Sequence, residues 1–350
     1  MEPVPWEVSA RDPAPLFELF RGCHATELLV AATAHLGLFR ELGDGALLPG
    51  ELAAALGLAR RPAAVLTTAL RAMGTLAMRG DGRLEATELA RAHLDPRSPH
   101  YVGDYFALAS GSAGVRAMAE RLKTDRPAGA DGGGGGVGFI YREGMPSAME
   151  GEEGARFFTM ALAGRARNVA PALAAAVPMT GARMLVDVAG GTGVYTVALL
   201  RANPSLRAVV WDRPEVLRVA SEFVRGSGLA DRVELRPGDM FRDSFPEGAD
   251  VVLLSNVLHD WAEEQCEEIL RRCAEGLPRG GRLVVHDVFL DDDHGGPLPV
   301  ALYSAALFSV TEGRAYSVAE YRGMLGRTGF AATEVVPTRV HCGALLAVRR

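Results

Sequence analysis

Several protein classes are excluded by what the sequence lacks. Its apolar runs, such as ELLVAATAHLGLF, are shorter than the ~20 residues that a membrane-spanning helix needs. The first residues, MEPVPWEVSARDPAPLF, show no basic stretch followed by an apolar one, so we expect no secretory signal and a cytoplasmic protein. The formal net charge of −6 argues against nucleic-acid or anionic-membrane partners, because both favour a basic surface.

Cysteine is scarce, and metal-ligand spacing is missing. The four cysteines form no CxxC pair. Cys266 and Cys273 are seven residues apart on a predicted helix, so we expect free thiols and not a zinc site. Asp287, Asp291 and His294 could be interpreted as metal ligands, but solvated charge explains the acidic loop DDDHGG better. We therefore predict no metal.

The length of 350 residues suggests two domains, and the two halves of the chain differ in pattern. We expect residues 1–170 to form a mainly helical domain. PGELAAALGLARRPAAVLTTALRAMGTL predicts a helix, a turn and a second helix, and LAMRGDGRLEAT predicts a hairpin around Asp81-Gly82. This order is typical of a winged helix, for which we expect a role in dimer contacts and in roofing a substrate pocket.

A winged helix also raises the possibility of a DNA-binding regulator. The second helix carries only Arg60, Arg61 and Arg71, and the chain is acidic, so we place this alternative last. The glycine-rich segment 128–138 lacks the strand, helix and lysine of a phosphate-binding loop and predicts a flexible loop.

The second half, 171–350, alternates apolar strand-like runs with helical segments. The runs are RMLVDVA, AVVWD, VELRPGD, DVVLLSN and RLVVHDVFL, followed by TEVVPTR and ALLAVR. Near-continuous apolar strands separated by helices indicate a parallel sheet that is covered on both faces. We predict an α/β, doubly wound, Rossmann-like domain with an antiparallel end.

A glycine turn follows the first of these strands, in the run VDVAGGTG. Its candidate ligand-binding residues are Asp187, Ala189, Gly190, Gly191 and Gly193. Ligands of such sheets bind beyond the carboxyl ends of the strands. The spacing fits a dinucleotide poorly, and Asp187 fits a cationic, amine-bearing ligand better than a phosphate.

The next two strands also end in acids. Asp212 stands where a carboxylate could accept from both hydroxyls of a ribose. Asp239 is expected to bond an adenine amino group, with Met240 packing on the ring and Phe241 beside it. Three acids at successive strand ends match the cofactor S-adenosyl-L-methionine.

Together with Leu258-His259-Asp260-Trp261, these motifs resemble the class I S-adenosylmethionine-dependent small-molecule O-methyltransferases of the plant caffeate and bacterial polyketide-tailoring type. The resemblance implies a homodimer formed through an N-terminal winged-helix domain. Ala189 replaces the first glycine of the family pattern VDVGGGTG. Ser255 stands where plant members usually carry a lysine near the adenine, and we keep it as a candidate cofactor contact.

His259 is the candidate general base, because it follows the fourth strand at the ligand edge and its ordinary pKa near 6.5 suits proton removal at neutral pH. Asp287 ends the fifth strand and would lie beside His259. The resemblance implies Glu312 as a second acid near that ring.

The acceptor pocket is expected to have aromatic and aliphatic walls. The candidates recur at helical spacing, so core packing is an equally good explanation for them: Phe158, Leu162, Tyr303, Leu307 and Phe308.

Three functions remain in order of preference. The first is methyl transfer to a phenolic hydroxyl of an aromatic small molecule in secondary metabolism. The second is C-methylation ortho to the hydroxyl of a phenolic amino acid or derivative, because the same base produces a phenolate that can attack through carbon. The third is the non-catalytic DNA-binding regulator.

Overall fold

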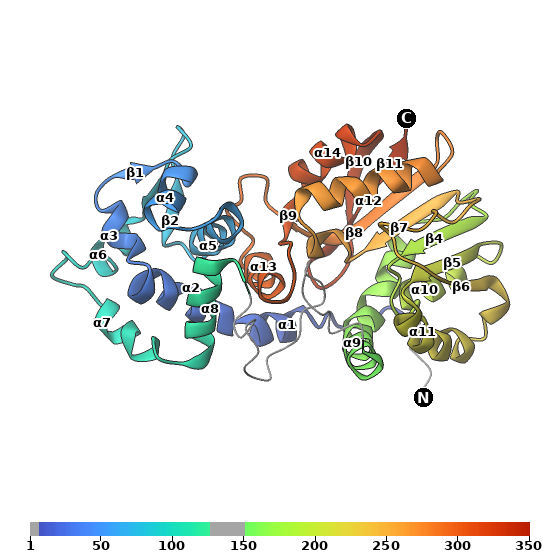
Figure 1. Ribbon diagram of the computed structural model, residues 1–350, viewed down its shortest axis with the longest axis horizontal. Helices are drawn as coiled ribbons and strands as arrows, with labels where there is room; N and C mark the ends of the chain where they lie inside the picture. The colour runs from blue at the N-terminus through green and yellow to red at the C-terminus, as the bar shows by residue number, and fades with distance from the viewer. Residues whose placement is uncertain (1–6, 127–150) are drawn as a thin grey trace. The chain divides into compact units, whose positions relative to one another are not determined.

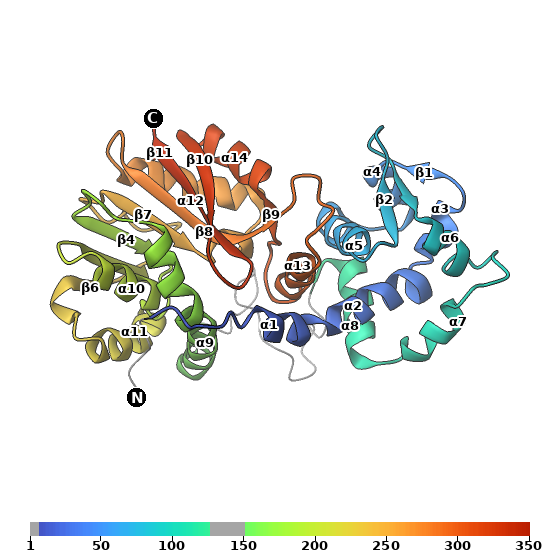
Figure 2. The same ribbon diagram turned by 180° about the vertical axis from the view of Figure 1, so that it is seen from behind.

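A computed structural model describes residues 7–126 and 151–350 of the chain (Figures 1 and 2). The glycine-rich segment 128–138 lies outside the described residues. The chain divides into two compact units. The sheet unit holds the described parts of 1–15 and 139–289 together with 316–350, and the helical unit holds the described part of 16–138 together with 290–315.

The chain passes between these units more than once, whereas the sequence analysis placed a single boundary at residue 170. Residues 290–315 follow the sheet strands in sequence but cluster with the helical unit. Helix α9 (Glu152–Ala176), expected in the first domain, clusters with the sheet unit. The expected roles of the first domain in dimerisation and in roofing the pocket stay predictions.

The helical unit contains short helices and three very short strands. Its elements are α1 (Ala14–Arg21), α2 (Cys23–Val30), η1 (Ala31–His35), α3 (Leu38–Leu42), β1 (Ala46–Leu47), α4 (Pro49–Ala55), α5 (Arg60–Ala72), β2 (Leu76–Met78), β3 (Leu84–Ala86), α6 (Glu88–His93), α7 (Gly103–Phe106), η2 (Ala107–Ala109), α8 (Ala113–Thr124) and α13 (Leu298–Val310).

The predicted winged-helix order is present in this unit. Helix α5 buries Val65, Leu66 and Leu70 on one face, as its periodicity indicates. Strands β2 and β3 pair antiparallel, and Gly82 has the positive φ of +80° that the tight turn needs. The hairpin prediction is therefore confirmed, and β1 completes a sheet of order β1-β3-β2.

The sheet unit contains every strand predicted in the second half. Its remaining elements are β4 (Met184–Val188), α10 (Val194–Ala202), β5 (Arg207–Asp212), α11 (Pro214–Gly226), η3 (Ala230–Arg232), β6 (Val233–Pro237), β7 (Val251–Ser255), η4 (Leu258–Asp260), α12 (Glu263–Gly276), β8 (Arg282–Leu290), β9 (Tyr316–Ser317), α14 (Val318–Arg327), β10 (Phe330–Pro337) and β11 (Cys342–Arg349).

The strand order of the sheet, β10-β11-β8-β7-β4-β5-β6, confirms the doubly wound prediction. Strands β6, β5, β4, β7 and β8 are parallel, and β11 and β10 add the expected antiparallel end. From β4 the chain runs outward through β5 and β6 and then returns to β7 on the other side. This reversal puts the switch point, where ligands of such sheets bind, between β4 and β7.

Helices cover both faces of the sheet, with α9, α10 and α11 on one face and α12 and α14 on the other (Figures 1 and 2). The central strands are apolar on both sides for this reason, and Val186, Val252 and Val285 are fully buried. Cys266 and Cys273 lie in the same core as free thiols, as predicted. None of the helices within the described ranges combines the length and the apolar character that crossing a bilayer requires.

Candidate active site

The glycine turn between β4 and α10 needs its small residues. Gly191 and Gly193 have positive φ values of +59° and +70°. A Cβ atom on Gly190 would lie 2.8 Å from Cγ of Asp187, so only glycine fits there. Ala189 also has a positive φ, +52°, which for an alanine costs ~1–2 kcal/mol. The departure from the family pattern is therefore tolerated in a strained conformation.

Asp187 lies beneath this turn and is almost completely buried. Its Oδ2 atom accepts a hydrogen bond of 2.6 Å from the hydroxyl of Thr196, a partner that the sequence analysis missed. Burial, together with the nearby charge of Asp212, raises the pKa of Asp187 to about 7, although the Thr196 bond opposes the shift. The carboxyl group is therefore partly protonated at neutral pH.

Asp212 ends the neighbouring strand β5 and faces the same turn. Its Oδ2 accepts from the backbone N–H of Gly191 at 2.8 Å, and its Oδ1 accepts from that of Arg213 at 2.7 Å. Burial raises the pKa of Asp212 to about 6 despite these bonds. Two carboxyl groups with raised pKa values thus meet at the glycine turn, which suits a cationic ligand carrying hydroxyl donors.

The turn after β6 holds the third predicted acid. Asp239 Oδ1 accepts from the backbone N–H of Phe241 at 2.8 Å, so this carboxylate stabilises the turn in which it lies. Met240 and Phe241 are half-buried and pack against the sheet core. The ring of Phe241 meets Trp261 edge to face, with centroids 4.6 Å apart. The assignment of these residues to the adenine stays a prediction.

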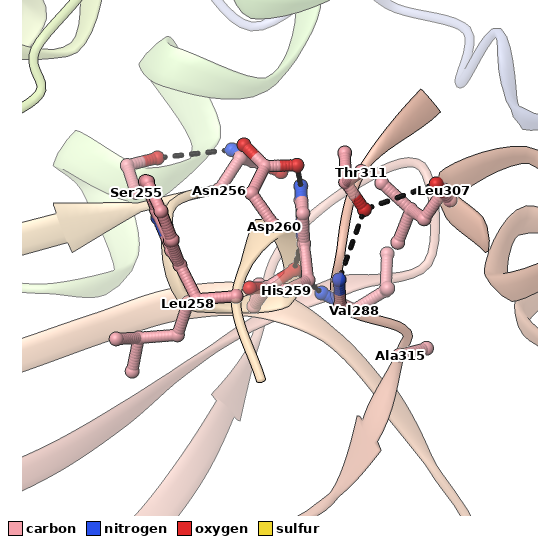
Figure 3. Close-up of polar contacts among 12 residues, drawn as sticks. Ser255, Asn256, Leu258, His259, Asp260, Val288, Leu307, Thr311 and Ala315 are labelled. Carbon is pink, nitrogen blue, oxygen red and sulfur yellow. Dashed lines mark hydrogen bonds and ion pairs between the residues drawn. The ribbon is translucent and has the colours of Figure 1, made fainter. Parts of the chain in front are cut away.

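His259 lies in the short helix η4 just beyond β7, and its side chain is buried (Figure 3). Its Nδ1 atom lies 2.5 Å from Oδ1 of Asp287, which is buried in the adjacent strand β8, one residue beyond the last residue that pairs with β7. The backbone N–H of Val288 donates to the same oxygen at 2.8 Å. Parallel neighbours β7 and β8 thus bring the predicted pair together.

A second carboxylate stands beside the ring. Figure 3 shows Asp260 next to His259, and Oδ1 of Asp260 lies 3.6 Å from Nε2. Burial alone would lower the pKa of His259, but Asp287 and Asp260 outweigh it and raise that pKa, while the charge of Arg165 acts in the opposite direction. Burial raises the pKa of Asp260 to about 6, against the opposing effect of His259.

Ser255 belongs to a partly buried polar network that the sequence analysis did not predict. Its hydroxyl lies 2.8 Å from Nδ1 of His286. The same hydroxyl accepts from the amide of Asn256 at 3.1 Å (Figure 3). The Asn256 amide also donates to the hydroxyl of Tyr195 at 3.2 Å, which links α10 to the loop before His259. The cofactor contact expected for Ser255 stays a prediction.

His286 is the one histidine of this network, and it differs sharply from His259. Burial and the charge of Arg165 lower the pKa of His286 to about 3, so its ring is neutral. It lies on the face of β8 opposite Asp287, where its Nε2 atom is 3.1 Å from the hydroxyl of Thr338. It therefore supports the network and is no competitor for the base.

The predicted pocket residues fall in both units. In the sheet unit, Phe158 is half-buried and Leu162 is 55% exposed on α9. In the helical unit, Leu307 is 5% exposed and Phe308 is fully buried, as core packing requires. Tyr303 is half-buried beneath the guanidinium of Arg21. Contact of these residues with an acceptor stays a prediction.

Glu312 belongs to the helical unit, and its role beside His259 also stays a prediction. Within the described residues, one group of three side chains has metal-ligand spacing: Cys23, His24 and Glu27 on α2. None of the predicted site residues belongs to it, and a 2.7 Å contact between His24 and Glu27 already pairs two of its members.

Comparison with known proteins gives a consistent result. Residues 134–331 match the model of the O-methyltransferase domain family. The 3-hydroxy-5-methyl-1-naphthoate 3-O-methyltransferase of Streptomyces sahachiroi is 35% identical over 328 residues, which cover 93% of this chain and 91% of the relative. The L-tyrosine C(3)-methyltransferase of Streptomyces lavendulae is 35% identical over a shorter stretch, 43% of this chain and 42% of the relative.

Solved structures show the same similarity over the whole chain. An O-methyltransferase family 2 protein from Planctomyces limnophilus, in complex with apigenin, superposes with a TM-score of 0.89 at 44% identity and covers 99% of this chain and 98% of its own. Human N-acetylserotonin methyltransferase, in complex with S-adenosylmethionine, gives a TM-score of 0.61 at 25% identity and covers 97% and 99%.

Proposed function

Because the chain belongs to the O-methyltransferase family and uses S-adenosylmethionine, we propose that His259 is the general base that activates a phenolic hydroxyl for methyl transfer. One observation carries the proposal. His259, held by Asp287, lies at the carboxyl edge of the same strands that carry the glycine turn, and Tyr195 and Asn256 connect the two places.

The residues around the glycine turn fit the cofactor. Asp187 and Asp212 are buried acids whose pKa values are raised, so a bound positive charge would stabilise their ionised forms. Each oxygen of Asp212 accepts one backbone hydrogen bond and retains a lone pair for a ribose hydroxyl. The cofactor supplies an electrophilic methyl group on its sulfonium.

The base acts through Nε2. The contact with Asp287 assigns the proton of the neutral ring to Nδ1, which leaves Nε2 to accept the proton of a phenol. The resulting phenolate oxygen is a far better nucleophile than the phenol, and general-base assistance of this kind contributes ~10²–10⁴-fold. The proton then rests on an imidazolium that Asp287 and Asp260 stabilise.

The acceptor class follows from the relatives. The S. sahachiroi relative acts on a hydroxynaphthoate, and the P. limnophilus structure holds apigenin, so we propose a phenolic aromatic acceptor from secondary metabolism. C-methylation ortho to the hydroxyl is the second candidate, because the S. lavendulae relative is a tyrosine C(3)-methyltransferase. Its similarity covers less than half of this chain, which favours oxygen as the acceptor atom.

A screen with isotopically labelled methyl donor tests the proposal. Phenolic acids, polyketides and tyrosine derivatives are incubated with the enzyme, and mass spectrometry and NMR locate the new methyl group on oxygen or carbon. We expect His259→Ala to lower turnover of the identified acceptor by ~10²-fold or more while calorimetric cofactor affinity stays near wild type. Lost cofactor binding with normal turnover of the residual complex would contradict the role of His259.

We also propose that the protein is a homodimer that associates through the helical unit. Leu16, Leu19 and Phe20 are 68%, 79% and 81% exposed on one helix, α1. Tyr105 and Leu108, on α7 and η2 of the same unit, are 74% and 80% exposed. Large apolar side chains at such exposure are typical of interaction surfaces, and the resemblance to dimeric family members favours a second copy as the partner.

A further inference from the structure

A third side chain stands behind the pair of His259 and Asp287. The hydroxyl of Tyr321, on α14, donates to Oδ2 of Asp287 at 3.2 Å, and the residue is completely buried. Oδ1 of Asp287 meets Nδ1 of His259 and the backbone N–H of Val288. The three side chains therefore form a continuous hydrogen-bonded chain from the helix to the imidazole.

We propose that Tyr321 is a positioning residue for the general base: its hydroxyl fixes the plane of the Asp287 carboxylate so that Oδ1 faces Nδ1 of His259. The inference rests on the proposed role of His259. A carboxylate held only at Oδ1 can rotate about its Cβ–Cγ bond, whereas one held at both oxygens keeps one orientation. The imidazole that it orients then keeps Nε2 turned toward the acceptor.

The surroundings of Tyr321 suit a fixed donor. Its ring packs edge to face against Phe289 and Tyr316, with both centroids 5.6 Å away. Helix α14 is anchored just before it by the capping box of Ser317 and Glu320. Burial and the neighbouring charge of Asp287 hold the pKa of Tyr321 well above its usual value, so the hydroxyl keeps its proton and remains a donor.

The charged groups around His259 determine what loss of this hydroxyl should do. Within the sheet unit, they are Asp287 from β8, Asp260 from η4 and Arg165 from α9. Without the Tyr321 hydroxyl, the carboxylate of Asp287 has one hydrogen-bond donor fewer, so its charge is less compensated and attracts the imidazolium more strongly. His259 should then remain protonated to higher pH, which moves the acidic limb of the pH profile of kcat to higher pH.

Tyr321→Phe tests the proposal, and Tyr316→Phe is its matched control. Tyr316 belongs to the same aromatic cluster, and its buried hydroxyl donates to the backbone oxygen of Trp261 at 2.7 Å. We expect Tyr321→Phe to lower kcat ~5–10-fold, to leave KM for the cofactor within twofold and to shift the acidic limb upward. Tyr316→Phe should leave the limb in place.

Two further measurements separate positioning from simple stabilisation. In an Asp287→Asn background, Tyr321→Phe should lower kcat by less than twofold, because the group through which it acts is gone. The downfield NMR proton of His259 Nδ1 should move in Tyr321→Phe and remain in Tyr316→Phe. An unmoved proton and an unshifted acidic limb, in a folded Tyr321→Phe enzyme, would overturn the inference.

The inference and the proposed function fail in different ways. If His259→Ala has normal turnover, the general base is misassigned and the role of Tyr321 falls with it. If His259→Ala is impaired but Tyr321→Phe behaves like Tyr316→Phe, the base stands and only the positioning role is wrong. A fully additive loss in the Asp287→Asn background would also reject that role.

Discussion

At the residue scale, the site consists of ionisable groups that the fold holds away from their ordinary behaviour. Burial raises the pKa of Asp187 to about 7 and that of Asp212 to about 6, and it lowers that of His286 to about 3. An acid whose pKa is raised on folding lowers the free energy of unfolding at neutral pH. We interpret the two acids as sites whose charge is stabilised when the cofactor binds.

Asp187→Asn should separate stability from binding. The folded pKa of about 7 lies above the unfolded value near 3.9, so stability is lost as pH rises from ~4 to ~7 and the full cost is present above pH 7. Without cofactor at pH 7.5, we expect the free energy of unfolding of the variant, measured by denaturant titration, to be ~1–3 kcal/mol higher than that of the wild type. Cofactor affinity, measured by calorimetry, should fall.

Asp250→Asn is the matched control for that prediction. Asp250 Oδ2 accepts from the backbone N–H groups of Arg183 and Met184 at the opposite end of β4. Its loss should lower stability and leave cofactor affinity unchanged. If Asp187→Asn were instead destabilised at pH 7.5 and bound cofactor normally, our interpretation of the buried acid would be rejected.

The sequence predicted those residues whose partners are set by strand order. Asp187, Asp212, His259 and Asp287 each lie in the second half of a recognisable strand or just after it, and parallel strands gather their carboxyl ends at one edge. Tyr321 could not be predicted in the same way, because it lies 34 residues from Asp287 on a helix whose packing against β8 the local pattern does not encode.

At the element scale, the side chain of Arg165 connects helix α9 to two places in the sheet unit. The guanidinium of Arg165 donates from Nη1 to Oδ1 of Asn256 at 2.6 Å and from Nη2 to Sγ of Cys342 at 2.8 Å. Asn256 adopts a positive φ of +56° in the loop that leads to His259. Arg165 therefore connects α9 to that loop and to the first residue of β11.

Arg165→Met should loosen this connection. The amide of Asn256 loses a charged partner, so we expect unfolding free energy to fall by ~1–3 kcal/mol. Hydrogen exchange measured by mass spectrometry should accelerate in residues 251–262. Arg167→Met is the control, because Arg167 lies on the same helix and stacks over Phe223 instead. Equal exchange in the two variants at residues 251–262 would show that Arg165 does not hold the loop.

Helices and strands were predicted correctly where the sequence pattern is local. The grouping of elements was not predicted where it depends on packing between segments far apart in the sequence. The strands from β4 to β11 and the hairpin at Gly82 follow from alternation and turn residues. The grouping of α13 with α5 does not, because their pairing joins segments more than 200 residues apart within the helical unit. A boundary drawn at one position in the sequence cannot describe such a chain.

At the scale of the whole molecule, the family match concerns mainly one of the two units. The matched residues 134–331 cover most of the sheet unit, which carries the proposed base and cofactor turn. We proposed that the helical unit supplies the surface for assembly. Its exposed apolar side chains on α1 carry that proposal, and assembly can be tested without knowing the acceptor.

Leu19→Lys combined with Phe20→Glu should make the protein monomeric. Both side chains are about four-fifths exposed, so charged replacements cost the fold little but oppose burial against a second copy. Sedimentation velocity should show a dimer for the wild type and a monomer for the variant. Leu89→Lys, at a 60% exposed position on another helix, α6, should remain dimeric. A monomeric wild type, or an unchanged double variant, would reject the proposed surface.

The most direct test of the central claim is the pH dependence of single-turnover methyl transfer by His259→Ala, measured with the identified phenol and with ring-fluorinated analogues of lower pKa. If His259 removes the phenolic proton, the variant should be impaired ~10²-fold or more at neutral pH. Its rate should then recover as the pH approaches the pKa of each phenol, and earlier for the more acidic analogues. A variant whose deficit is the same at every pH and for every phenol would contradict the account.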